Sequence, residues 1–153
     1  MSRPPFEILE HTADIGLKAY GPTIEALFVN AAAGLQALAL PQKDRDDDEG
    51  TSEPDADQAQ TLRASGGNYE DLLVGWLSEI LYFIDAEGWS FAEFRIIRIV
   101  EEAGELTMEG RGIGSRRDPL SRSRAVPVKA VTYHQIAVRE TADGWEAVVY
   151  FDI

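Results

Sequence analysis

The chain has 153 residues, of which 44% are hydrophobic and 27% charged, a globular balance that excludes a disordered or collagen-like chain. It has no cysteine and two histidines, which excludes disulfides, a thiolate nucleophile and cysteine-based zinc sites. The net charge is −13, and residues 44–57 contribute −7 of it, with eight acids against Arg45. No apolar run reaches the roughly 18 residues of a membrane-spanning helix, so we expect a single cytoplasmic domain over 1–153 with no membrane partner.

The first elements are two short strands and a helix. Alternating residues predict strands over 6–10 and 15–20, joined by a polar corner at residues 11–14. Thr23 is a suitable N-cap, and apolar residues then recur at helical spacing until Pro41 ends the pattern. The first helix is therefore expected between these two residues.

The acidic segment at 42–58 has almost nothing apolar to bury and no periodicity. This composition predicts a solvated, mobile loop. A cation-binding loop is the alternative, but the EF-hand pattern is not met because no Glu stands at its last position.

The second half predicts one more helix and most of the strands. Residues 59–65 form a short strand, and Asn68 caps a helix whose apolar stripe is wider than one face. Four further strands are expected at 91–101, 105–112, 125–140 and 145–153. The order of elements favours an α+β fold, a two-layer sandwich of about six mostly antiparallel strands with two main helices.

Residues 110–130 are basic, with six Arg and Lys against Asp118. We expect an Arg-rich loop here over 111–124, serving either solubility or contact with phosphate or an acidic surface. Gly110 to Gly114 has closely spaced glycines without the dinucleotide-binding fingerprint, so it is also interpreted as a loop.

Polar residues in strand contexts are the candidates for chemistry. Asp152 and the carboxylate of Ile153 end an apolar strand, and Asp14 ends another. Such an oxygen cluster suits Ca²⁺, Mg²⁺ or Mn²⁺, whereas the alternative is an ordinary exposed terminus and a turn cap. His11 and His134 are either a base and a metal ligand or structural histidines.

Four blocks of sequence resemble the archease family: His11-Thr-Ala-Asp-Ile-Gly-Leu-Lys-Ala-Tyr-Gly21, the helix Leu72-Leu-Val-Gly-Trp-Leu-Ser-Glu-Ile-Leu-Tyr82, Lys129-Ala-Val-Thr-Tyr-His134, and Phe151-Asp-Ile153. They stand in the family's order and span nearly the whole chain. The resemblance implies a protein that is not an enzyme but activates the GTP-dependent RNA-splicing ligase. That ligase joins a 3′-phosphate or cyclic phosphate to a 5′-hydroxyl, and its activator promotes ligase guanylylation and turnover in tRNA splicing or RNA repair.

The resemblance also implies the site residues. A metal ion, Ca²⁺ in the family site with Mg²⁺ or Mn²⁺ as alternatives, would be held by Asp14, Asp152 and Ile153, the last through its terminal carboxylate. Lys129, His134 and His11 would serve activation of the ligase, with RNA and GTP reached only through that partner. Apolar neighbours predict a partly desolvated Lys129 in a strand, and structural ion pairing is the rival role.

The residues also fit a second class of function. The carboxylates and the arginines are also compatible with a stand-alone metal-dependent phosphatase or nuclease, or with a nucleic-acid-binding module. The lack of a nucleophile with its base, and of a basic face interleaved with aromatic residues, disfavours both.

Overall fold

A computed structural model of the chain describes residues 4–10, 14–40, 58–117 and 128–153. In chain order its elements are β1 (Phe6–Glu10), β2 (Asp14–Gly21), α1 (Ile24–Ala39), β3 (Gln58–Gly66), α3 (Tyr69–Asp85), β4 (Trp89–Glu102), β5 (Glu105–Arg116), β6 (Ala130–Thr141) and β7 (Gly144–Asp152). Of the predicted acidic loop at 42–58, only Gln58 is among the described residues, where it begins β3.

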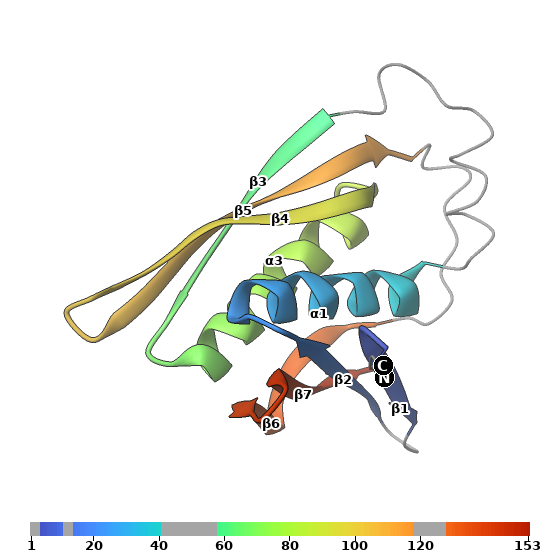
Figure 1. Cartoon of the computed structure of the whole chain (residues 1–153). Helices are drawn as coiled ribbons and strands as arrows, with labels where there is room; N and C mark the ends of the chain where they lie inside the picture. The colour runs from blue at the N-terminus through green and yellow to red at the C-terminus, as the bar shows by residue number, and fades with distance from the viewer. Residues whose placement is uncertain (1–3, 11–13, 41–57, 118–127) are drawn as a thin grey trace.

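The strands form two antiparallel sheets, with the orders β1-β2-β7-β6 and β3-β5-β4. Both helices lie between the sheets and contact strands of each (Figure 1). The α+β class with two helices and mostly antiparallel strands is confirmed. The described residues contain seven strands rather than about six. The strands form one sheet on each side of the helices, so the structure has three layers where two were expected.

The caps and the core agree with the sequence patterns. The Thr23 hydroxyl accepts a hydrogen bond from Ala26 N at 3.0 Å, and the Asn68 side chain accepts one from Asp71 N at 2.8 Å. A single hydrophobic cluster joins both helices to both sheets. At its centre the Trp76 ring is fully buried, and its Nε1 donates to Phe28 O at 2.9 Å.

The interpretation of Gly110 to Gly114 as a loop is wrong, because β5 runs through these residues to Arg116. The three glycines alternate along the strand and face the core. A Cβ at Gly110 would lie 2.7 Å from the Trp76 ring, and one at Gly112 would collide with the Phe91 ring. Large rings fill the space left by small residues at every second position, so this spacing belongs to a strand.

Candidate functional site

Asp14 and Asp152 lie directly opposite each other at the ends of β2 and β7. On the other side of β7, Asp152 is paired with Ala130 at the start of β6, and Lys129 N donates to Asp152 O at 2.8 Å. Ile153 follows directly. The structure therefore brings three of the predicted segments, far apart in sequence, to one corner of the four-stranded sheet.

The two carboxylates belong to the outer face of this sheet. Alternate residues of β7 up to Phe151 are buried against the helices, whereas Asp152 is exposed. Side chains directly opposite in an antiparallel pair have Cβ atoms about 4.5–5.5 Å apart, and two anions at that separation repel. A hard divalent cation would offset this repulsion, so the donor types fit the predicted ion.

Within the described ranges, no group of three or more His, Asp or Glu side chains is placed to hold a metal. The two aspartates supply only two carboxylate side chains, so the predicted set depends on the terminal carboxylate of Ile153 as its third member. His11 lies outside the described residues.

His134 shares this neighbourhood through an aromatic contact. Its ring lies edge-on to the ring of Tyr150, with centroids 6.1 Å apart, and Tyr150 is two residues before Asp152 on the same side of β7. The Tyr150 ring in turn covers Gly16, where an added Cβ would lie 2.7 Å from its Cε1 atom. Tyr150 was not among the sequence candidates, although its spacing from Asp152 along an alternating strand could have indicated it.

An irregularity in β6 places His134. Thr132 pairs with Tyr150 and Ala137 with Val148, so four residues of β6 stand opposite the single residue between those partners. Gln135 has a φ of 55°, in the left-handed region, and His134 N donates to the Thr132 hydroxyl at 3.2 Å. No sequence pattern indicated this excursion because neither Gly nor Pro occurs in it.

The N-terminal turn of α3 supports the same segment. Glu70 Oε2 accepts from Val138 N at 3.0 Å. Tyr133 is 60% exposed, and the pKa of its phenol is raised by partial desolvation and by a hydrogen bond to Asp71. Two consecutive acids of α3 therefore contact β6 within the irregular residues and just after them.

Lys129 differs from its predicted surroundings. It precedes the first residue of β6 and is exposed rather than desolvated within a strand, because β6 begins only at Ala130. Its backbone is bonded to Asp152, yet within the described part of the chain its ammonium makes no ion pair with either aspartate.

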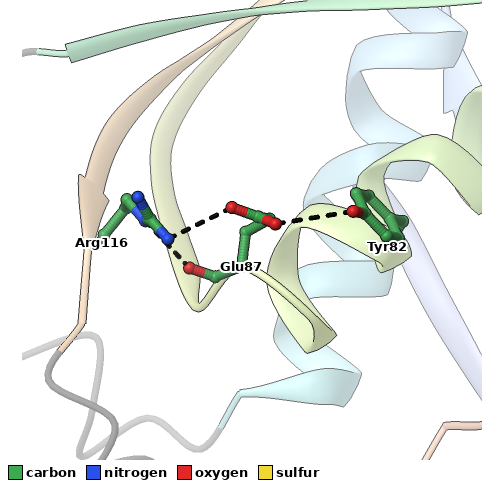
Figure 2. Close-up of polar contacts among 3 residues, drawn as sticks. All are labelled: Tyr82, Glu87 and Arg116. Carbon is green, nitrogen blue, oxygen red and sulfur yellow. Dashed lines mark hydrogen bonds and ion pairs between the residues drawn. The ribbon is translucent and has the colours of Figure 1, made fainter.

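Two arginines of the predicted Arg-rich loop, Arg111 and Arg116, lie in β5. Arg116 is bonded to Glu87, away from the Asp14–Asp152 corner. Figure 2 shows Glu87 between Arg116 and Tyr82. Arg116 donates to the Glu87 carbonyl at 3.1 Å and to its carboxylate at 3.2 Å, and the Tyr82 hydroxyl donates to that carboxylate at 3.5 Å. Arg116 thus fastens the end of β5 to the residues after α3. Residues 118–127 lie outside the described part.

These features define a class: a small α+β protein whose outer sheet face carries two opposed carboxylates beside the chain end, with a histidine and a tyrosine next to them. No helix among the described residues is long and apolar enough to cross a membrane.

Comparisons with known proteins identify the family of this chain. The model of the archease protein family (MTH1598/TM1083) matches residues 6–153. The protein archease of Methanosarcina barkeri is 38% identical over 148 residues, covering 97% of this chain and 95% of that protein. Protein archease of Pyrococcus furiosus is 32% identical over 149 residues, covering 97% of this chain and 98% of that protein. The solution structure of Methanobacterium thermoautotrophicum protein 1598 superimposes with a TM-score of 0.77 at 28% identity, covering 97% of this chain and 99% of that one. The chain belongs to the archease family.

Proposed function

We propose that this protein is an accessory factor that activates the GTP-dependent RNA-splicing ligase, and that it is not itself an enzyme. Membership of the archease family supports the proposal, together with one observation: Asp14 faces Asp152 beside the chain end. Asp14 is half-buried and Asp152 is exposed, and two carboxylates in directly opposite positions repel each other, so a cation between them would be favourable. The proposed effect is faster guanylylation of the ligase histidine and repeated turnover in tRNA splicing or RNA repair.

In this proposal Asp14, Asp152 and the Ile153 carboxylate hold one divalent cation, Ca²⁺ or alternatively Mg²⁺ or Mn²⁺. When bound, the cation would neutralise the carboxylates and give the corner a fixed set of oxygen ligands. The backbone positions the ligands. The β2–β7 pairing sets the separation of the two aspartates, and the hydrogen bond from Lys129 N to Asp152 O fixes the end of β7 beside the start of β6.

Lys129 and His134 are the proposed contacts with the ligase. The exposed ammonium of Lys129 is available to a nucleotide phosphate or a ligase carboxylate. His134 is exposed and held over Tyr150 by the irregular part of β6. His11 is proposed for the same role from the family resemblance alone.

The test measures guanylylation of the cognate ligase with and without this protein. Lys129→Met should fold normally and lose stimulation, whereas Lys129→Arg separates a need for charge from a need for a compact ammonium. Lys18→Met, a control on β2 whose ammonium lies over the Tyr20 ring, should stimulate fully. A ligase that reacts equally well without the protein contradicts the proposal, and hydrolysis of phosphate esters or RNA by the protein alone supports the phosphatase or nuclease instead.

The cation is tested separately by thermal unfolding with Ca²⁺. A ligand at 100 times its Kd stabilises the folded state by about 2.7 kcal/mol, so wild-type protein should melt at a higher temperature. Asp14→Asn and Asp152→Asn should lose that rise, and Glu102→Gln, at the far end of β4, should keep it. An equal rise in all four proteins would place the ion elsewhere.

A further inference from the structure

The second sheet has a face that no described element covers. Both helices pack on one side of β3-β5-β4, and Figure 1 shows the other side turned away from them. The strand register sets two adjacent rows on this outer side, Thr61–Arg111–Arg95 and Arg63–Glu109–Arg98. We call the four arginines of these rows, all exposed, the arginine face.

Two of these arginines have exposed ion pairs. Arg95 Nε lies 2.7 Å from Glu93 Oε2, and Arg98 Nη2 lies 3.3 Å from Glu109 Oε1. The arginine side chains of these pairs are 60% and 68% exposed, so water screens the pairs and a stronger anion can displace the carboxylates. Among the described residues, the guanidinium groups of Arg63 and Arg111 make no ion pair.

The central pair of the face is unfavourable for the fold alone. Arg111 stands directly opposite Arg95 across β5 and β4, and like charges in directly opposite positions destabilise a sheet. An anion bound between the two guanidinium groups would remove that repulsion. The rows are about 6.8 Å apart along β3 and β5, two residues of each strand, so neighbouring rows offer separate positions for successive anionic groups.

We propose that the arginine face binds the phosphate backbone of an RNA strand. Guanidinium groups make bidentate contacts with phosphates. The rows contain no aromatic side chain on which bases stack, so the contact does not depend on base sequence. With a net charge of −13, the rest of the protein repels a polyanion, which confines RNA to this side.

RNA is preferred over an acidic protein surface because the inference rests on the proposed function, which sets the chain beside a ligase acting on RNA. The arginine face and the Asp14–Asp152 corner belong to different sheets. RNA can therefore be held without blocking the proposed contact between that corner and the ligase.

The experiment titrates the full-length protein into a fluorescently labelled single-stranded RNA over a series of salt concentrations, and measures anisotropy. Each lost phosphate contact should reduce the slope of log K against log salt by about 0.7. Arg111→Gln should show that reduction and a several-fold weaker affinity, and Arg111→Glu should abolish binding. The matched control Lys18→Gln removes one positive charge from the other sheet and should leave slope and affinity unchanged.

Three results overturn the inference: no binding even at low salt, equal losses in Arg111→Gln and Lys18→Gln, or binding of polyglutamate but not of RNA. Circular dichroism melts of each variant separate lost binding from lost folding. Guanylylation of the ligase measured without RNA is a separate readout, and Arg111→Gln should stimulate it fully. If the proposed function is wrong, the wild-type protein will not stimulate guanylylation. If only the proposal for the arginine face is wrong, the wild-type protein will still stimulate guanylylation but will not bind RNA.

Discussion

The side-chain amide of Gln36 in α1 makes two hydrogen bonds with the main chain of Phe91 in β4. Its Nε2 donates to Phe91 O, and Phe91 N donates to its Oε1, each at 2.6 Å and both buried. β4 is an edge strand, so this amide occupies the place that a neighbouring strand would take. The pair joins α1 to the three-stranded sheet at a point where water cannot replace it.

Gln36→Leu should therefore destabilise the protein strongly. The substitution leaves a buried donor and a buried acceptor of Phe91 without partners, which costs about 2–6 kcal/mol of unfolding free energy for the two groups. Denaturant unfolding followed by circular dichroism measures the change. Gln58→Leu, at an exposed position of β3, should stay within about 0.5 kcal/mol of wild type; an equal effect of both variants would mean that the amide bonds are unimportant.

Extending the chain beyond Ile153 should weaken cation binding. A Gly-Ser tail converts the terminal carboxylate into a neutral amide and removes one anionic ligand from the corner formed by Asp14 and Asp152. The melting rise with Ca²⁺ and the stimulation of ligase guanylylation should both fall. The same tail added before Met1 is the control, and a C-terminal tail that changes neither readout would remove the carboxylate from the site.

Tyr133 should ionise at a higher pH than a free tyrosine. Partial desolvation and the hydrogen bond to Asp71 raise its pKa above 10.0. The stabilising contact is complete below the pKa of the unfolded chain and is lost as the pH rises through the folded one. Because the side chain is 60% exposed, the contribution to stability is small.

Ultraviolet absorbance of tyrosinate in wild-type protein, minus that in Tyr133→Phe, gives the titration of this one residue. Its midpoint should lie above 10.0 and move down in Asp71→Asn, which removes the negative charge but keeps an acceptor. A midpoint below the ordinary value would contradict the contact with Asp71.

Ala103→Asn should stabilise the β4–β5 hairpin. Ala103 and Gly104 form its two-residue turn with φ values of 53° and 79°, as in a type I′ turn, where Asn-Gly is preferred and Ala is strained. We expect a gain of about 0.5–1 kcal/mol in unfolding free energy, because a left-handed backbone costs most L residues roughly 1–2 kcal/mol and Asn less. Ala142→Asn, in the β6–β7 turn and without a positive φ, should change stability little, and a loss on Ala103→Asn would exclude this turn geometry.

The helices and most strands were predictable because their signals are local. Thr23 and Asn68 each cap a helix with their own side chain, and the apolar period follows within a few residues. The strand over 105–112 was expected, but its glycine-rich end up to Gly114 was misread as a loop, since the ring that fills the space at Gly112 belongs to Phe91 on a neighbouring strand. Sequence alone does not reveal which ring will need that space.

The candidate site likewise has a part that the sequence predicted and a part that it did not. Asp14 and Asp152 stood out as acids at the ends of apolar strands, and the β2–β7 register sets them opposite each other. The support from α3 was not predictable, because Asp71 reaches Tyr133 across 62 positions of sequence (133 minus 71). Such contacts follow from packing of a helix on a sheet, which local patterns do not encode.

The irregular stretch of β6 also bears on pairing between two copies of the protein. β6 is the outermost strand of its sheet, and an uninterrupted outer strand is a template for pairing with another chain and for aggregation. Between Thr132 and Ala137 the ladder loses its regular spacing, and Gln135 turns the backbone away from extended geometry. The excursion that places His134 beside Tyr150 thus also interrupts the edge along which a second copy would have to pair.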